Sequence, residues 1–528
     1  MITLCKKLWT VAITTCLIAC QKVDEPKQIV GEGEQDIVEN ENGFIATESQ
    51  TILGEVIDIP YSVENLLKAY ENLPAQTKSQ IDPAAIQPTH YYVRFYPKSI
   101  EELDILRNVK PYVFLSETPL DRKVVVGGSS YHDPSIPDEL PTFQYTVVPV
   151  ARWAELEKSV PIEASILIKA YIPDYDEAYT TKSAEKYGIP PVAYEALLKE
   201  AYRITGNEYD VIPETKSSWN PNGRIRAYDT DMASYIPVKG VRIRGTHLLK
   251  VKETLTDTNG CFTLASFNNP VSLKIVWESD DWDIRDGLIG QATFDGPSLN
   301  NQSWYCDIGT NHEKNVRYAV IQNVAYKCFY ENIGGLYAPL FSNKLKFCQH
   351  TGHGSSCFDS SIPGGEFIET YIEDILGDYK GSKEYTENVA HEIGHSVHYS
   401  WATSVYNSHS QIIKESWADF YSVAIKYQIY GEFMAYVDSW PKYTINLEYS
   451  PIFIDLYDDV NQRSFYNDSD LPDDNVSGYT WGQLNLILYY SFSLADLKTK
   501  AKNTKPACVT NDQIDSLFTV YEANWSDN

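Results

Sequence analysis

One short segment limits the possible folds of this chain more than any other: Asn388-Val-Ala-His391-Glu392-Ile-Gly-His395. In an α-helix, residues four apart lie on one face, so the imidazoles of His391 and His395 can bind the same metal ion. Glu392 lies about 100° around the helix, close enough to hold a water molecule at the metal without becoming a ligand. The segment therefore predicts a helix that carries two metal ligands and a general base.

A third ligand has to come from elsewhere in the chain, because catalytic zinc has three protein ligands and one open position. Glu415 is the candidate, since it follows His395 by twenty residues in a second predicted helix, 411–430. Asp419 lies one helical turn after Glu415 and could accept the free N–H of a ligand histidine, which would fix the orientation of the ring. The pattern predicts a site for one Zn²⁺ per chain.

This combination resembles the gluzincin metallopeptidases, the thermolysin-like group, in which HExxH is followed by a ligand glutamate and by an aspartate four residues later. The resemblance implies that His391, His395 and Glu415 bind zinc. It also implies that Glu392 is the general base for peptide-bond hydrolysis by a zinc-activated water, and that Asp419 orients a ligand histidine. We therefore expect a zinc metallopeptidase whose substrate is a peptide or a protein.

The metzincin pattern HExxHxxGxxH does not fit this chain, because His398 stands at the position of the glycine and Trp401 at that of the third histidine. We expect His398 to extend the helix as a histidine that is packed or solvated near the site. A role for His398 as a fourth ligand is the less favoured alternative.

The transition state of peptide hydrolysis needs one more hydrogen-bond donor for its developing oxyanion. In thermolysin-like enzymes a histidine well downstream of the ligand glutamate contributes, but the last histidine of this chain is His409. Tyr479 is our candidate substitute, with packing in an aromatic-rich core as the alternative. The aminopeptidase motif Gly-x-Met-Glu-Asn is also missing from the sequence, which favours an endopeptidase over an exopeptidase.

Residues 1–19 resemble the signal peptide of a bacterial lipoprotein, with two lysines, an apolar run from Leu8 to Ile18 and a small residue before Cys20. By that resemblance Cys20 is lipidated, and residues 20–50 form an acidic flexible tether. We expect a Bacteroidota-like lipoprotein in the outer membrane or on the cell surface of a Gram-negative bacterium. The lipid anchor would be its contact with the membrane, since no other segment approaches transmembrane length.

With 528 residues, the chain is too long for one hydrophobic core, so we expect a multidomain α+β protein. Residues 51–210 mix strand and helix patterns and predict an α/β domain of unknown role. Within it we expect a strand at 91–95, a helix at 100–108 and a second strand at 112–115. The formal net charge of −28 argues against nucleic acid as a partner, and the oligomeric state stays unknown.

Residues 223–285 contain short alternating strands with a hairpin turn at 257–260, and resemble a carboxypeptidase-regulatory-like, transthyretin-like β-sandwich. Residues 286–528 begin with a long helix at 313–332, continue with strand patterns and reach the HExxH helix, for which Ser382 is the predicted N-cap. This order is expected of a zincin-like metallopeptidase domain, whose last strand borders the cleft and pairs with the peptide substrate.

Two other interpretations of the chain stay open. The protein could be a non-catalytic cell-surface binding or adhesion lipoprotein that retains a metal site, which suits its acidic charge and its β-sandwich. Residues 51–210 could alternatively be a prodomain whose removal activates the enzyme.

Six cysteines follow Cys20 in the chain, an even number that permits disulfides in an exported protein. The segment Cys348-Gln-His350-Thr-Gly-His353-Gly-Ser-Ser-Cys357 is the one cluster of cysteine and histidine. We expect a short disulfide loop there, because the spacing fits no common structural zinc pattern. A second metal site is the alternative.

Overall fold

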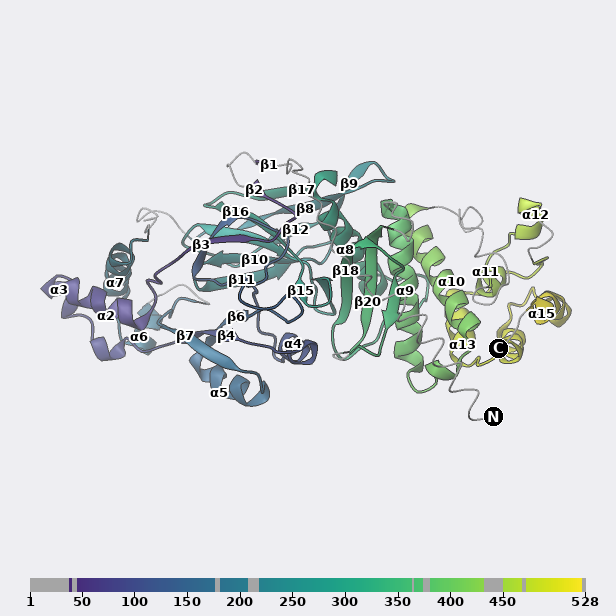
Figure 1. Ribbon diagram of the computed structural model, residues 1–528, viewed down its shortest axis with the longest axis horizontal. Helices are drawn as coiled ribbons and strands as arrows, with labels where there is room; N and C mark the ends of the chain where they lie inside the picture. Colours follow the sequence, from purple (N-terminus) through teal and green to yellow (C-terminus); the bar gives the residue numbers. More distant parts are fainter. Residues whose placement is uncertain are drawn as a thin grey trace.

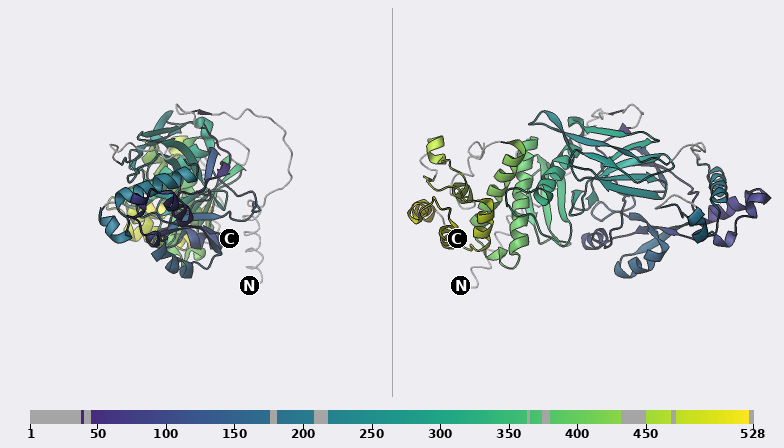
Figure 2. Two further views of the ribbon diagram at one scale, coloured as in Figure 1. Left: turned by 90° about the vertical axis from the view of Figure 1, so that its left-hand side faces the viewer. Right: turned by 180° about the vertical axis from the view of Figure 1, so that it is seen from behind.

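The computed structural model describes residues 38–39, 45–175, 181–207, 218–362, 365–373, 380–431, 450–467 and 472–524. They form a multidomain α+β protein with several β-sheets and a helical C-terminal region. The N-terminal helices, the central sheets and the C-terminal helices lie one after another along the long axis (Figure 1), as the view from behind also shows (Figure 2). The predicted signal peptide, Cys20 and most of the predicted tether lie outside the described residues.

The N-terminal region contains a three-stranded antiparallel sheet in the order β6-β4-β7, made of Gln144–Pro149, His90–Phe95 and Ala164–Ala170. The strand predicted at 91–95 is therefore confirmed, as is the helix that follows it, α4 (Ile100–Arg107). Helices α2 (Val63–Asn72) and α7 (Pro191–Ile204) pack together at the end of the molecule.

The second strand predicted in this region, at 112–115, is wrong. The segment belongs to no sheet, and the next strand is β5 (Arg122–Val126), which pairs with β3 (Ile52–Val56). The apolar pattern that suggested a strand has another cause. Tyr112 packs against the neighbouring region, where its hydroxyl bonds to Glu253 and Glu278.

Two four-stranded sheets occupy the centre of the molecule. One has the order β11-β10-β13-β16, formed by Lys250–Leu255, Arg242–His247, Val271–Val276 and Thr293–Leu299. The other has β12-β8-β17 with β9 beside β8, formed by Cys261–Thr263, Asn222–Asp229, Trp304–Ile308 and Ser234–Pro237. The sheets face one another, because Gly296 of the first lies against the ring of Trp304 from the second.

The turn at 257–260 is not the predicted hairpin turn. It joins β11 to β12, and these strands pair with β10 and β8 in different sheets. A turn between two facing sheets has the same glycine and asparagine chemistry as a hairpin turn, so residue types alone do not separate the two.

A mixed five-stranded sheet follows, in the order β15-β14-β18-β20-β19. Its strands are Gly290–Gln291, Trp282–Asp286, Leu345–His353, Phe367–Glu373 and Cys357–Asp359. The three inner strands are parallel, and both edge strands run antiparallel to them. The predicted boundary at 285/286 cuts across this arrangement, because β14 belongs to this sheet while β16 and β17 return to the central sheets.

Three long helices accompany this sheet: α8 (Glu313–Tyr330), α9 (Ser382–Ala402) and α10 (Gln411–Tyr430). Helix α9 lies between the sheet and α10 (Figure 1), and it packs more extensively against α10 than against α8. Helix α10 ends at Gly431, whose φ of 71° is the left-handed conformation in which helices often stop.

The N-terminus of α9 is held by the turn between β8 and β9, not by a cap within its own sequence. Gly381 is the N-cap, and the predicted cap Ser382 is instead the first helical residue. The backbone N–H of Ser382 donates to the Thr230 hydroxyl at 2.8 Å, and that of Lys383 donates to Asp231 at 2.9 Å. A loop of the central sheets thus satisfies helix donors that need a partner.

Further helices form the C-terminal region: Ile452–Tyr457, Gln462–Tyr466, Trp481–Tyr489, Leu494–Thr504 and Asn511–Asn524, labelled α11 to α15. Apolar side chains from α11, α13, α14 and α15 and from α8, α9 and α10 share one hydrophobic core with both central sheets. No helix in the described ranges combines the length and the apolar character needed to cross a membrane.

Candidate metal centre

Helices α9 and α10 bring together three side chains that could bind a metal: His391, His395 and Glu415. The two imidazole Nε2 atoms are 3.2 Å apart and lie 3.3 and 3.2 Å from Oε2 of Glu415. Tetrahedral ligands around zinc, at bond lengths of about 2.0–2.1 Å, are separated by about 3.3–3.4 Å. The three atoms thus match three corners of such a tetrahedron, with the fourth open.

The chemistry of these atoms also fits a cation. Nδ1 of His391 is 2.9 Å from a carboxylate oxygen of Asp419, so this nitrogen carries the ring proton as a donor. Nε2 of His391 then presents a lone pair toward the Glu415 carboxylate, which is an acceptor as well. Two acceptors in contact repel one another unless a proton or a metal ion lies between them.

The pKa values express the same need for a positive charge. Burial lowers the pKa of His391, but hydrogen bonds to Asp419 and Glu415 outweigh it and raise that pKa to about 10. Burial raises the pKa of Glu415, but the charge of His395 and the hydrogen bonds to both histidines hold it well below its usual range. Both shifts favour a positive charge at the place where a metal ion would bind.

Two further side chains support the ligands and were not predicted. Gln411 donates a hydrogen bond to the second carboxylate oxygen of Glu415. The hydroxyl of Tyr406 lies 3.5 Å from Nδ1 of His395, so it can accept the proton of that nitrogen when Nε2 binds a metal. Gln411 precedes Glu415 by one helical turn, a spacing visible in the sequence. Tyr406 lies in a short 3₁₀ helix, Tyr406–Ser408, for which no spacing rule applies.

Glu392 lies beside the ligands without belonging to them. It is 6% exposed, and the pKa of its carboxyl group is raised, first by burial and also by the nearby charge of Glu415. The positive charges of both histidines and the backbone amide of Phe358 act in the opposite direction. A carboxylate with a raised pKa takes up a proton more readily, as a general base must.

Phe358 belongs to β19, so this contact brings the edge of the five-stranded sheet to Glu392. The Phe358 ring also packs against Tyr399 of α9, with ring centroids 5.5 Å apart. Strand β19 pairs with β20 on one side and is the last strand of the sheet within the described part of the chain. The metal-binding group therefore lies next to a sheet edge.

His398 is a packed helix-face histidine, one of the two states expected from the sequence. It is 1% exposed, and its Nε2 lies 2.6 Å from Nδ1 of His409. Burial lowers the pKa of both histidines, to about 4 for His409, and the charge of Lys414 adds to this effect. Both rings are uncharged at neutral pH.

Tyr479, the predicted oxyanion partner, has another contact. Its hydroxyl donates to the backbone carbonyl of Ala501 in α14 at 2.8 Å, and the residue is 1% exposed. It packs in the hydrophobic core with the C-terminal helices. The structure thus brings His391, His395, Glu415, Asp419 and Glu392 together and gives Tyr479 the packing role that was its alternative.

The predicted disulfide loop between Cys348 and Cys357 is wrong. Cys348 of β18 and Cys357 of β19 both pair with Glu369 of β20, one from each side. Two strand spacings, each about 4.8 Å, separate them, and a disulfide tolerates a Cα separation of at most about 7 Å. Nε2 of His350, from the same segment, lies 3.0 Å from Oε2 of Glu369.

No protein-family model matches this chain, and no curated protein matches it by sequence.

Proposed function

We propose that this protein is a zinc-dependent peptidase, and an endopeptidase rather than an exopeptidase. One observation carries the proposal: the donor atoms of His391, His395 and Glu415 lie 3.2–3.3 Å from one another beside the buried Glu392. Two histidines and a glutamate, with an open fourth position, are a ligand set of catalytic zinc. The resemblance to gluzincins points to the same set.

Each residue has a defined task in this proposal. Zinc bound there would act as a Lewis acid and would make water more acidic. Glu392 takes a proton from the attacking water as the water adds to the scissile carbonyl, and then passes that proton to the leaving amine. Asp419 and Tyr406 hold the rings of His391 and His395 in the orientation that ligation needs.

The edge strand supports a peptide as the substrate. Within the described residues β19 is an edge strand, and an extended peptide can add to such an edge by main-chain hydrogen bonds. Because the amide of Phe358 contacts Glu392, such a peptide would pass the general base with its backbone exposed to attack. This arrangement of a mixed sheet, an antiparallel edge strand and the HExxH helix supports a zincin-like catalytic region, with the central sheets as a β-sandwich.

The location of the enzyme is part of the proposal. The lipoprotein-like signal and Cys20 suggest anchoring by lipid in the outer membrane or at the cell surface, where the tether would hold the catalytic region away from the membrane.

The decisive test is Glu392→Gln in a chain that begins at residue 21, assayed on a broad peptide library by mass spectrometry. We expect a loss of at least about 10²-fold in the cleavage rate, the range that general-base catalysis contributes. Bound zinc should stay at one per chain, because Glu392 is not a ligand.

Glu384→Gln is the matched control, since Glu384 is an exposed carboxylate of the same helix. It should leave the cleavage rate unchanged. Wild-type cleavage by the Glu392 variant would refute the mechanism. Zinc binding by the wild-type chain without cleavage of any peptide would favour the binding or adhesion module.

A further inference from the structure

Lys414 stands one residue before Glu415 of the candidate metal centre. It is partly buried, and its ammonium group lies 5.1 Å from the ring centroid of Tyr406. Among the described residues, no ion pair or hydrogen bond joins this group to a carboxylate. Withdrawing an ammonium group from water costs free energy unless an anion compensates.

Several fully buried lysines among the described residues have such a partner. Lys344 pairs with Glu278 at 2.9 Å, Lys426 with Glu387 at 2.6 Å, and Lys250 with Asp174 at 2.5 Å. Lys426 lies on the same helix as Lys414, three turns further on. Lys414 has no such partner among the described residues, and neither has Lys500; of these two, Lys414 is the one next to Glu415 in the chain.

The position of Lys414 connects it with the proposed cleft. The Lys414 ammonium group lies over the ring of Tyr406, and the Tyr406 hydroxyl lies 3.5 Å from Nδ1 of His395. A single aromatic ring thus separates Lys414 from a metal ligand. Tyr399 packs against Tyr406 and against Phe358 of β19, at 5.5 Å from each ring centroid. A row of three rings leads from the sheet edge to the ammonium group.

Lys414 supplies the positive charge beside Tyr406, since the neighbouring histidines do not. His398 and His409 are uncharged at neutral pH, as described above, and Glu415 is occupied by the two ligand histidines. A substrate carboxylate that reached Lys414 would supply the missing anion, and a lysine binds a carboxylate as a point charge without strict geometry.

We propose that Lys414 is a specificity-determining residue that binds a carboxylate of the peptide substrate close to the scissile bond. This inference rests on the proposed peptidase function. The carboxylate has two sources: the side chain of an aspartate or glutamate, or the α-carboxylate at the end of a short peptide. The first makes the enzyme selective for acidic sequences, and the second directs it toward peptide C-termini.

The test uses matched peptides around a cleavage site found with the full chain. One pair differs by Glu against Gln, moved through the positions that flank the scissile bond, and the other pair has a free or an amidated C-terminus. We expect a kcat/KM ratio of about tenfold or more in favour of the carboxylate form in one pair, as a charge-assisted hydrogen bond provides. Lys414→Gln should bring this ratio to about one, and Lys414→Arg should restore it.

The ratio is measured within each variant, so a general loss of activity cancels. Lys500→Gln is the control, because Lys500 also lies over a tyrosine ring, Tyr490, at 5.0 Å, but in α14. Binding of the same peptides to Glu392→Gln, by calorimetry, gives a second readout that needs no turnover. There Lys414→Gln should remove the preference in Kd as well.

The outcomes separate this inference from the function on which it rests. If the wild-type chain cleaves no peptide, the proposed function fails. If it cleaves both members of each pair equally well, Lys414 does not select a carboxylate. If Lys414→Gln lowers the melting temperature and slows both members alike with an unchanged ratio, Lys414 only supports Tyr406, and the inference is overturned.

Discussion

Two buried clusters of charged side chains differ in how their charges are arranged. One is the candidate metal centre of His391, His395 and Glu415, between α9 and α10. The other, the junction network of Tyr112, Arg242, Glu278 and Lys344, lies where the N-terminal region, the central sheets and the five-stranded sheet meet. In the junction network each acid faces a cation, whereas in the metal centre acceptors face each other. Buried charge alone therefore does not distinguish a candidate metal site. Buried acceptor atoms that face one another do, because a cation between them would remove their repulsion.

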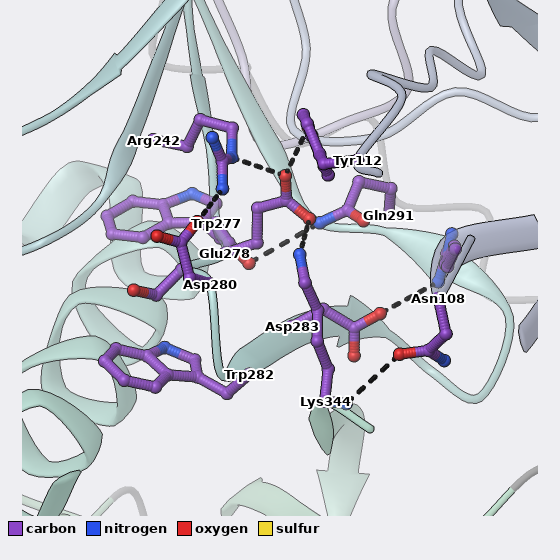
Figure 3. A network of polar contacts seen from close by, with 12 residues as sticks. Asn108, Tyr112, Arg242, Trp277, Glu278, Asp280, Trp282, Asp283, Gln291 and Lys344 are labelled. Atoms are coloured by element: carbon purple, nitrogen blue, oxygen red, sulfur yellow. Dashed lines mark hydrogen bonds and ion pairs between the residues drawn. The ribbon is translucent and has the colours of Figure 1, made fainter. Parts of the chain in front are cut away.

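Glu278 is the centre of the junction network, and Figure 3 shows its partners directed toward it. Its carboxylate lies 2.7 Å from Arg242 and 2.9 Å from Lys344, and it accepts a hydrogen bond from Tyr112 at 3.1 Å. Burial raises the pKa of Glu278, but Lys344 and Arg242 outweigh it and lower that pKa to about 2. The carboxylate is charged at every physiological pH.

Ion pairs beside the junction network test the alternative that residues 51–210 are a prodomain. Arg107 of this region pairs with Glu117 at 3.0 Å and with Asp283 of β14 at 3.4 Å, and all three side chains are less than a tenth exposed. Removal of the region would take Arg107 from Asp283 and the Tyr112 hydroxyl from Glu278, and both acids are buried in the remaining protein. Such an interface favours a permanent part of the protein over a segment that is cut away.

Glu278→Ala should have the largest effect and tests whether the junction network is structural. The change leaves Arg242 and Lys344 buried without their shared anion, so we expect the free energy of unfolding to fall by about 3–5 kcal/mol in urea denaturation. Zinc content after refolding should not change. Glu64→Ala removes the surface pair with Lys68, in which the Glu64 side chain is 78% exposed and that of Lys68 59%, and should leave the free energy of unfolding nearly unchanged.

Equal losses in these two variants would remove the distinction between the junction network and an ordinary surface pair.

Glu415→Ala tests the other cluster. Loss of a ligand should weaken zinc binding by more than the roughly 10–100-fold that loss of an outer partner costs. We therefore expect zinc well below one per chain by atomic emission after dialysis against buffer with ordinary trace zinc. Glu384→Ala on α9 serves as the control. Full retention of zinc by Glu415→Ala would exclude Glu415 from the site.

The pH dependence of zinc binding should be smaller and has a definite sign. The pKa of His391 is raised to about 10, so at lower pH a proton competes for the nitrogen that binds the metal. Zinc affinity should rise with pH between about pH 6 and 9, by up to about tenfold per unit, in competition with a chromophoric chelator. Asp419→Asn weakens the bond that raises this pKa, so its affinity should level off at lower pH.

An affinity that is independent of pH in the wild-type chain would contradict the raised pKa of His391 and the acceptor arrangement inferred from it.

Local patterns in the chain predicted much of the candidate site. Helix α10 has the predicted bounds 411–430, and α9 carries His391 and His395 one turn apart as expected. Both results follow from the period of the helix, which depends only on neighbouring residues. The fold class, a multidomain α+β protein, was predicted from the length of the chain and its mixed strand and helix patterns.

Interactions between distant segments decided the rest. Cys348 and Cys357 form no disulfide, because their strands, β18 and β19, pair with opposite sides of β20. The cap of α9 comes from Thr230 and Asp231, about 150 residues earlier in the chain. No sequence spacing encodes contacts of this kind, since loop length and sheet order determine them.

By itself, the sequence determined which residues can bind a metal and which one can act as a base, because histidine and glutamate have fixed donor chemistry and the helix has a fixed period. Only the tertiary structure decided the distances of 3.2–3.3 Å between the donors, the contact of Phe358 with Glu392, and the position of the Lys414 ammonium group over the ring of Tyr406. These depend on how α9, α10 and β19 pack, and packing is a property of the whole chain.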